Sequence, residues 1–316
     1  MGLLGGDGLA VASMMPRDPP PACESLPSRA LPDAATQHRM LDARQSDAFH
    51  AQGFLVLPGF KTAAELEAVT ARACAIVDAF EPGTHSSRFS TRDRALVNDA
   101  ALIASANAVH CFFEEEALDD EGRLRVPKAQ SINKIGHALH ERDAAFDAFS
   151  HGPALAALAA DLGLAAPQVW QSQVIFKQPR IGGEVGWHQD ASFFVTAPHT
   201  VTTFWFALED ATLDNGCLWV QPGGHRGPLR ERFVCRNGQL TMEALDATPW
   251  PALADALALP VAAGTLVCFH GLLPHCSGPN RSAVSRMAYT LHATDATATY
   301  SPLNWLQRPD GVRGLT

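Results

Sequence analysis

Charged side chains are scarce in this sequence, and the basic ones form no cluster. Asp, Glu, Lys and Arg make up 18% of the 316 residues, and the formal net charge is −9. A protein that binds nucleic acid by neutralising its phosphates should carry a basic patch. We therefore expect no nucleic acid among the partners, and the same argument disfavours an acidic membrane surface.

Long apolar runs, paired cysteines and nucleotide-binding glycine motifs are also missing. The apolar runs are shorter than the roughly 18 residues that a membrane helix needs. The seven cysteines are odd in number and include no CxxC pair, and no signal peptide is recognisable. These absences predict a cytoplasmic protein with reduced thiols and no membrane partner. Neither GxGxxG nor a Walker loop occurs, so a bound nucleotide is not indicated.

Residues 1–44 differ in composition from the rest of the chain. Gly, Pro, Ala and Ser dominate there, and no apolar period is visible. Such a segment buries too little surface to offset its ordering entropy, so we predict a disordered N-terminal extension. Hydrophobic residues make up 47% of the whole sequence, enough for a sizeable core. We predict one folded domain over residues 45–316.

Local signals predict one strand and two helices in the first half of the chain. Residues 54–57 form a short apolar run that a Pro-Gly pair ends, as in a strand and turn. Thr62 and Glu65 have the spacing of a capping box, and apolar residues recur behind them at helical spacing for about five turns. A second helix is predicted over residues 153–162, with proline in its first turn and glycine after it.

The second half of the chain alternates short β-type runs with turns. The runs are rich in Val, Thr, Phe and Trp and cover residues 169–177, 201–208, 217–220, 265–269 and 286–292. Clusters of Gly, Pro, Asn and Asp separate them. Many short strands with such turns between them are typical of a β-sandwich or a jelly-roll barrel. We therefore predict a mainly β fold with flanking helices.

The tripeptide His188-Gln189-Asp190 is a candidate for a chemical site. In an extended segment, residues two apart point to the same side, so the imidazole and the carboxylate can face one metal ion. Two histidines and one carboxylate would leave open positions on an iron(II) ion. The candidates for the missing ligand are His199, His225, His270, His275 and His292. Because the chain has 13 histidines, a His-x-Asp tripeptide can also arise by chance.

Longer blocks around these residues carry a resemblance to a known family. Residues 274–282 read Pro-His-Cys-Ser-Gly-Pro-Asn-Arg-Ser, and further blocks cover 131–140, 175–179, 182–185, 209–219, 222–225 and 301–306. In this order, the blocks resemble the phytanoyl-CoA dioxygenase family of iron(II)- and 2-oxoglutarate-dependent oxygenases. The resemblance extends over about residues 45–308, nearly all of the chain that we expect to be folded.

The resemblance implies a fold, a metal site and a co-substrate site. The fold is a double-stranded β-helix, which is a jelly-roll or cupin-like barrel. The implied ligands of iron(II) are His188, Asp190 and His275. The implied co-substrates are 2-oxoglutarate and dioxygen, and the residues implied to contact 2-oxoglutarate are Lys134, Trp205, Ser277 and Arg286. A guanidinium suits the distal carboxylate of 2-oxoglutarate because it can donate two charge-assisted hydrogen bonds.

From the residue types alone, several of these assignments have an alternative. Arg286 can be a surface ion-pair residue, and Lys134 can be a solvated lysine near a helix start. Trp205 can be a residue of the core. His270 is the main rival of His275 as the third ligand, although the block that follows His275 favours His275.

For the substrate, the resemblance and the residue types indicate only a small organic molecule, which would be hydroxylated with release of succinate and carbon dioxide. The candidate contacts are Gln173, Trp187, Phe193 and Trp305, and Gln173 stands where a methionine is usual in the resembled family. Asp190 favours hydroxylation, since a small residue at that position would suit halogenation. The competing interpretations are a non-catalytic sensor that binds metal and 2-oxoglutarate, and a structural cupin-like protein. The sequence does not decide between a monomer and a homodimer.

Overall fold

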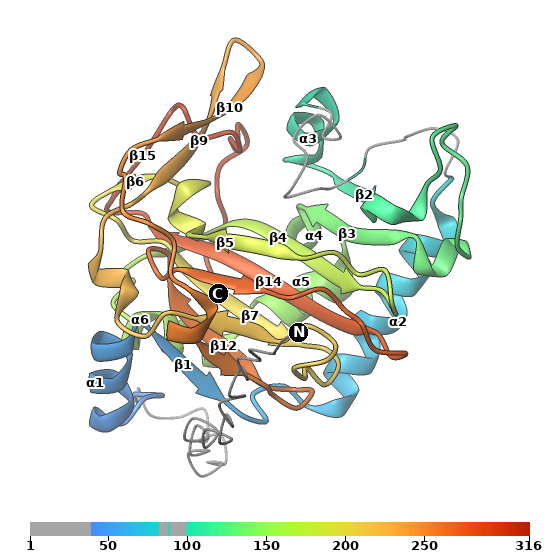
Figure 1. Cartoon of the computed structure of the whole chain (residues 1–316). Helices are drawn as coiled ribbons and strands as arrows, with labels where there is room; N and C mark the ends of the chain where they lie inside the picture. Colours follow the sequence, from blue (N-terminus) through green and yellow to red (C-terminus); the bar gives the residue numbers. More distant parts are fainter. Residues whose placement is uncertain (1–38, 82–87, 89–98) are drawn as a thin grey trace, which may run out of the picture.

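The computed structural model describes residues 39–81, 88 and 99–316, which form two facing β-sheets with flanking helices (Figure 1). The helices are α1 (Ala43–Gln52), α2 (Ala63–Ala79), α3 (Asp99–Ser105), α4 (Leu139–Arg142), α5 (Ala144–Ser150) and α6 (Pro153–Asp161). The strands are β1 (Phe54–Leu57), β2 (Val109–Phe113), β3 (Ile132–His137), β4 (Pro167–Lys177), β5 (Val185–His188), β6 (Thr196–Ala197), β7 (Thr202–Ala207), β8 (Leu218–Val220), β9 (Glu231–Arg236), β10 (Gln239–Ala244), β11 (Leu257–Leu259), β12 (Leu266–His270), β13 (His275–Ser277), β14 (Arg286–Asp295) and β15 (Thr299–Tyr300).

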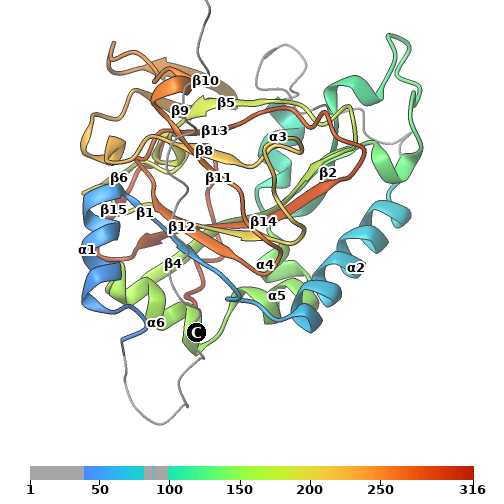
Figure 2. The ribbon, with the colours of Figure 1, turned by 60° about the horizontal axis from the view of Figure 1, so that its bottom comes forward.

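The two main sheets are built from antiparallel ladders. The large sheet has the order β1-β12-β7-β14-β4-β3-β2, and the small sheet has the order β11-β8-β13-β5. Two further strand pairs, β9–β10 and β6–β15, lie outside them. Figure 2 shows the small sheet above the large sheet and α2, α5 and α6 below it. This arrangement is the jelly roll with flanking helices that the sequence predicts, so the fold class is confirmed.

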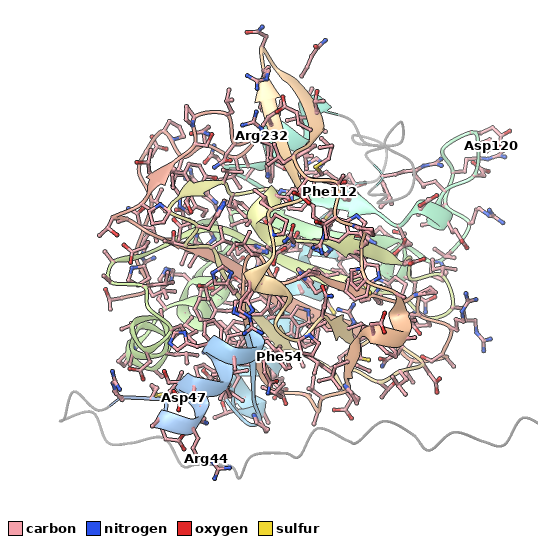
Figure 3. All side chains as sticks on the ribbon, turned by 60° about the vertical axis from the view of Figure 1, so that its left-hand side comes forward. Arg44, Asp47, Phe54, Phe112, Asp120 and Arg232 are labelled. Carbon is pink, nitrogen blue, oxygen red and sulfur yellow. The ribbon has the colours of Figure 1, made fainter. Side chains whose placement is uncertain are left out.

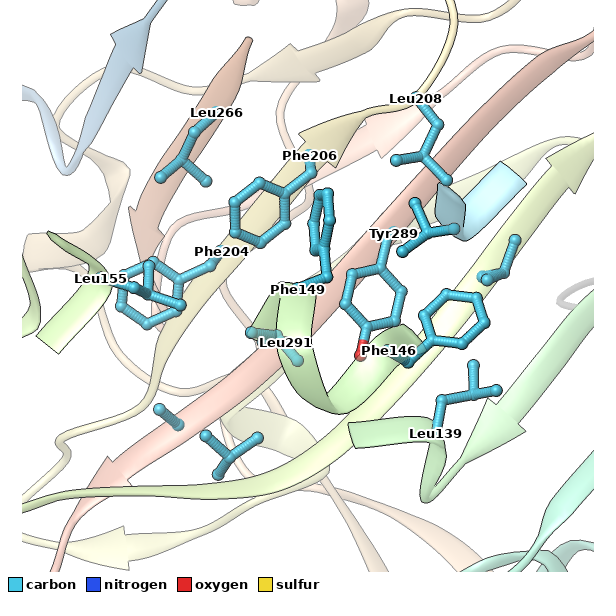
Figure 4. Close-up of a cluster of buried hydrophobic side chains, with 14 of the residues drawn as sticks. Leu139, Phe146, Phe149, Leu155, Phe204, Phe206, Leu208, Leu266, Tyr289 and Leu291 are labelled. Carbon is cyan, nitrogen blue, oxygen red and sulfur yellow. The ribbon is translucent and has the colours of Figure 1, made fainter. Parts of the chain in front are cut away.

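The helix-facing side of the large sheet carries the main hydrophobic core. Figure 4 shows alternate residues of β7 and β14 packed against α5 and α6, namely Phe204, Phe206, Tyr289 and Leu291 against Phe146, Phe149 and Leu155. The ring centre of Phe149 lies 5.1 Å from that of Phe206 and 5.6 Å from that of Tyr289. Because side chains alternate along a strand, the intervening residues of β7 and β14 face the small sheet.

A second core lies between the two sheets. Trp205, Val267 and Phe269 of the large sheet pack there with Leu218 and Val220 of the small sheet. The same face of the large sheet also carries buried charged and polar side chains on β3, β4, β7 and β14. Buried polar groups need partners, so this face is where a functional site is expected.

Most elements predicted from local signals lie close to the predicted positions. The strand at 54–57 is β1, and both hydrogen bonds of the capping box between Thr62 and Glu65 are present at the start of α2. The helix predicted over 153–162 is α6, which ends one residue earlier. The five β-type runs correspond to β4, β7, β8, β12 and β14, with bounds that differ by up to three residues.

The helix α1 begins inside the segment that was predicted to be disordered. Asp42 caps it, and a capping box joins Asp42 to Gln45. Leu41 is also buried, so the last residues of the expected extension belong to the folded part. The sequence shows no helical period here because Phe49 is the one buried residue of α1. The remainder of the expected disorder, residues 1–38, lies outside the described residues.

The β9–β10 hairpin and α3 lie on the side of the large sheet away from α2 (Figure 1). Figure 3 shows Arg232 of β9 and Phe112 of β2 on that side, whereas Arg44 and Asp47 of α1 lie at the other end. In the described part of the chain, no helix has both the length and the apolar character that a membrane crossing requires. The described cysteines are free thiols, as expected.

Phe149→Ala should remove a central part of the helix-facing core. Phe149 is 3% exposed, and truncation of a buried phenylalanine usually costs about 3–5 kcal/mol. We expect a loss of this size in the free energy of unfolding, measured with urea. Leu213→Ala is the control: Leu213 is 60% exposed, and we expect a change of no more than about 0.5 kcal/mol. Equal effects of the two substitutions would contradict this placement of the core.

Candidate metal centre and co-substrate site

Two histidines face each other across adjacent strands of the small sheet. His188 ends β5 and His275 begins β13, and the strand register pairs them directly. Their ring centres lie 4.1 Å apart. His188 Nδ1 lies 2.9 Å from the carbonyl oxygen of Gly186, and His275 Nδ1 lies 3.0 Å from that of Leu273. These contacts favour a proton on each Nδ1, which leaves each Nε2 lone pair available to a metal.

Asp190 adds a carboxylate to the histidine pair. Gln189 is extended, with φ −125° and ψ 130°, so Asp190 at the start of the 3-10 helix η5 (Asp190–Ser192) points to the same side as His188. Asp190 Oδ1 lies 3.6 Å from His188 Nε2 and 3.8 Å from His275 Nε2. Within the described ranges, His188, Asp190 and His275 are the one group of three or more His, Cys, Asp or Glu side chains whose potential ligand atoms all lie within 4.8 Å of one another.

The protonation states of His188 and Asp190 suit a divalent metal. Burial lowers the pKa of His188 to about 4, with a further lowering by His275, so the imidazole is neutral near pH 7. Burial raises the pKa of Asp190, but His275 and His292 outweigh it and hold that pKa well below its usual range. Neutral imidazole and ionised carboxylate are the forms that ligate metals. Two histidines and one carboxylate fit the ligand preference of iron(II).

His270, the rival of His275, lies elsewhere. It ends β12 in the large sheet, and its ring centre lies 5.5 Å from that of His225. Its Nδ1 accepts a hydrogen bond from the backbone N–H of Leu272 at 3.1 Å. The structure therefore brings His275, and not His270, to His188 and Asp190. Of the other candidates, His199 is exposed on a loop, whereas His292 lies beside Asp190.

Arg286 begins β14 directly after a turn that Asn280 holds. The Asn280 amide donates to the carbonyl oxygens of Lys177 at 2.9 Å and Val284 at 2.7 Å. Arg286 is 1% exposed, and burial lowers its pKa to about 10, so it stays a cation near pH 7. Its Nε and Nη1 have no hydrogen-bond partner. Unsatisfied donors on a buried cation are costly, and these two fit the carboxylate of an anionic ligand.

Lys177 is a second buried basic side chain, whose place in this interior the sequence did not predict. It lies opposite Arg286 in the register of β4 and β14 and is 1% exposed. Its Nζ donates to the carbonyl oxygen of Gly183 at 2.6 Å and lies 3.5 Å from that of Ser277. Gly216 makes room for it, since a Cβ there would lie 2.6 Å from Lys177 Cδ. Burial, with Arg286 nearby, holds the pKa of Lys177 well below its usual range.

Lys134 lies in the middle of β3, not near a helix start. It is 6% exposed, and its Nζ donates to Gln173 Oε1 at 3.3 Å. Burial lowers its pKa to about 7, although the carboxylates of Glu114 and Asp190 act in the opposite direction. A buried lysine that titrates near neutral pH is typical of functional sites.

Trp205 and Ser277 line the same interior. Trp205 is 3% exposed and belongs to the core between the sheets, and the guanidinium carbon of Arg286 lies 5.7 Å from its ring centre. Ser277 ends β13, two residues after His275, and is 4% exposed. Both residues are thus buried close to the metal-ligand group or to Arg286. The structure brings Trp205 to Arg286, places Ser277 two residues after His275 on β13, and buries Lys134 near Asp190.

The four residues expected at the substrate differ in accessibility. Gln173, Trp187 and Phe193 are half-buried, and the ring centre of Phe193 lies 6.3 Å from that of His188. Trp305 is 5% exposed, and it packs with His137 at 5.1 Å between ring centres. Trp305 therefore has the surroundings of a packing residue. Phe193 has partly accessible surface near the metal-ligand group, Gln173 lies at Lys134, and Trp187 precedes His188 in β5 and so points to the opposite side of that strand.

Comparison with known proteins places this chain in a family. The family model described as "Phytanoyl-CoA dioxygenase (PhyH)" matches residues 49–288. The chain belongs to the phytanoyl-CoA dioxygenase family. It is similar to a phytanoyl-CoA dioxygenase of Arabidopsis thaliana, with 41% identity over 265 residues that cover 84% of this chain and 93% of the relative. The resemblance drawn from the sequence blocks is confirmed.

Two further proteins illustrate the range of phytanoyl-CoA dioxygenase relatives and structural neighbours. Phytanoyl-CoA dioxygenase domain-containing protein 1 of Bos taurus is 42% identical over 276 residues, which cover 84% of this chain and 95% of the relative. The solved structure of the epimerase SnoN in complex with Fe3+, alpha ketoglutarate and nogalamycin RO has a TM-score of 0.57. It is 19% identical and covers 82% of this chain and 85% of its own, so the likeness concerns the fold.

His275→Ala tests the choice of the third ligand. In this member of the phytanoyl-CoA dioxygenase family, we expect it to weaken Co(II) binding by more than about 100-fold, beyond the usual effect of a residue outside the ligand set. His270→Ala is the control and should bind Co(II) as the unchanged protein does. Isothermal titration calorimetry without oxygen measures both. Undiminished affinity in His275→Ala would refute the assignment.

Proposed function

We propose that this protein is an iron(II)- and 2-oxoglutarate-dependent dioxygenase that hydroxylates a small organic substrate. One observation carries the proposal: the group of His188, Asp190 and His275 shares the interior between the sheets with Arg286, whose Nε and Nη1 have no partner. The metal-ligand group alone would suit several reactions. A buried guanidinium beside it supplies what the distal carboxylate of 2-oxoglutarate needs.

The proposed reaction couples two oxidations. Dioxygen, 2-oxoglutarate and a substrate C–H bond give a C–OH bond, succinate and carbon dioxide, with one oxygen atom in the alcohol and the other in succinate. Iron, when bound, supplies the redox chemistry that activates dioxygen. The side chains of the protein bind and orient the reactants and exclude water.

The buried basic side chains bind the co-substrate. Arg286 donates its free N–H groups to the distal carboxylate, and Ser277 adds a hydroxyl donor from β13. Lys177 brings a second basic group next to Arg286, and a bound dianion would favour its protonated form where water is excluded. Lys134, on the neighbouring strand β3, supplies a further positive charge and is oriented by Gln173. Trp205 packs against the guanidinium and restricts its rotation.

The substrate is proposed to be small and without a polyphosphate group. The Arabidopsis relative is named for phytanoyl-CoA, and SnoN was crystallised with nogalamycin RO, so substrate size varies among similar proteins. The formal net charge here is −9, and the sequence has no basic cluster to receive the phosphates of coenzyme A. The half-buried Gln173 and Phe193 provide one amide and one aromatic surface for an organic substrate.

Asp190→Ala tests the catalytic reaction. The anaerobically iron-loaded protein, exposed to air, should form succinate from 2-oxoglutarate, and a metabolite library should contain compounds that accelerate it. Asp190→Ala should reduce succinate formation to background, because the metal loses its anionic ligand. Formation of succinate is measured by mass spectrometry. If the unchanged protein binds Co(II) and 2-oxoglutarate but forms no succinate with any compound, the sensor interpretation replaces this one.

Arg286→Lys tests the co-substrate site. The substitution keeps a positive charge but loses the forked donor geometry. A hydrogen bond to a charged group contributes about 1.5–3 kcal/mol, so we expect the KM for 2-oxoglutarate to rise roughly 10- to 100-fold. Co(II) affinity should stay unchanged, because Arg286 is not in the ligand group. Arg281→Lys is the control, since Arg281 is exposed in the turn before β14. An unchanged KM in Arg286→Lys would rule out the proposed contact.

A further inference from the structure

The two oxygen atoms of the Asp190 carboxylate have different surroundings. Oδ1 faces the small sheet, 3.6 Å from His188 Nε2 and 3.8 Å from His275 Nε2. Oδ2 faces the large sheet, where it accepts the hydroxyl of Thr203 at 2.5 Å and lies 3.4 Å from His292 Nε2. Asp190 is 5% exposed, and Lys134 is a further charged neighbour of its carboxylate. Oδ1 is thus directed at His188 and His275, whereas Oδ2 contacts Thr203 and His292 of the large sheet.

Thr203 and His292 reach this oxygen from neighbouring strands. They are cross-strand partners in the register of β7 and β14, on the face of the large sheet that is turned toward the small sheet. The ring of His292 is stacked on Phe194, with 4.9 Å between ring centres and an interplanar angle of 26°. The His292 side chain is 5% exposed. Packing therefore fixes the orientation of the imidazole that lies beside Asp190.

The row of cross-strand partners that contains Thr203 and His292 also supports His275. Phe269 of β12 is the partner of Thr203 on its other side, and its ring centre lies 4.6 Å from that of His275. One row of residues across β12, β7 and β14 thus contacts two members of the metal-ligand group. Contacts of this kind orient ligands and are as much a part of a metal site as the ligands themselves.

We propose that Thr203 and His292 are positioning residues that hold Asp190 as a ligand through Oδ1 alone. The inference rests on the proposed function, because it assigns a role in holding iron and 2-oxoglutarate together. A carboxylate that is free to rotate can bind a metal with both oxygens. Iron held by His188, His275 and one Asp190 oxygen would keep open positions for 2-oxoglutarate and dioxygen. A second Asp190 oxygen would compete for the positions that 2-oxoglutarate and dioxygen need.

The hydroxyl of Thr203 is the stronger of the two restraints. Its distance of 2.5 Å to Oδ2 is in the range of charge-assisted O–H···O⁻ hydrogen bonds, whereas the contact of His292 at 3.4 Å is longer. Thr203 is 1% exposed, so water does not replace the hydroxyl without rearrangement. Loss of the hydroxyl therefore leaves Oδ2 able to turn toward the metal.

Thr203→Val tests the inference, because valine keeps the shape and removes the hydroxyl. The measurements are Co(II) affinity, the visible absorption of the Co(II) protein, and the affinity of that protein for 2-oxoglutarate. We expect Co(II) affinity to change little, the absorption to shift with the altered coordination, and the 2-oxoglutarate affinity to fall about 10- to 100-fold. Thr203→Ser keeps a hydroxyl and should show the Co(II) affinity, the absorption and the 2-oxoglutarate affinity of the unchanged protein. A role in folding alone would not separate metal affinity from 2-oxoglutarate affinity.

Thr202→Val is the matched control. Thr202 is the preceding residue of β7, is 3% exposed and points to the other face of the sheet. The Thr202→Val protein should bind Co(II) and 2-oxoglutarate with the same affinities as the unchanged protein. If Thr203→Val does not fold, the pair His292→Leu and His292→Gln replaces it, since glutamine retains an N–H donor. His292→Leu should then lose 2-oxoglutarate affinity and His292→Gln should retain it.

The outcomes separate this inference from the proposed function. If the unchanged protein binds Co(II) and 2-oxoglutarate, and Thr203→Val shows the same absorption and the same affinities, the positioning role is overturned while the function stands. A parallel loss of Co(II) and 2-oxoglutarate affinity in Thr203→Val also overturns it. If the unchanged protein binds neither Co(II) nor 2-oxoglutarate, the proposed function itself fails.

Discussion

A single buried carboxylate joins the two sheets of this fold. Asp190 lies between the histidines of the small sheet and Thr203 and His292 of the large sheet. An ionised carboxylate is costly to bury unless its surroundings compensate the charge. Burial raises the pKa of Asp190, but the imidazole groups on both sides, first those of His275 and His292, hold it low. The packing of the two sheets and the geometry of the ligand group therefore depend on the same residue.

Basic side chains lie further along the interior between the two sheets. Arg286 and Lys177 are buried across from each other on β14 and β4, where burial lowers the pKa of both side chains and the carboxylates of Glu114 and Glu184 partly oppose this at Lys177. A guanidinium buried as Arg286 is raises the free energy of the protein unless an anion lies close to it. The cost is consistent with a site that is completed by a dianionic ligand, because binding then removes an unfavourable interaction as well as forming favourable ones.

Local sequence patterns predicted what depends on neighbours along the chain. The capping box at Thr62 and the spacing of His188 and Asp190 could be read directly, because each is a relation over two or three residues. The third ligand could not be chosen by spacing: His275 was preferred over His270 only through the block around it. The sequence did not predict the roles of Lys177, Thr203 and His292. The partners of these residues are set by cross-strand register, which pairs residues about 90 to 110 positions apart.

Gln173 shows how one substitution can alter a site without altering its ligands. Its Oε1 accepts a hydrogen bond from Lys134 Nζ at 3.3 Å. A thioether is a weak acceptor, so a methionine would leave the ammonium less well oriented. Because Gln173 is half-buried, its remaining polar atoms also make this part of the site more polar than a methionine would. A change at this position therefore acts on Lys134 and on the substrate side together, while the register that places His188, Asp190 and His275 is unaffected.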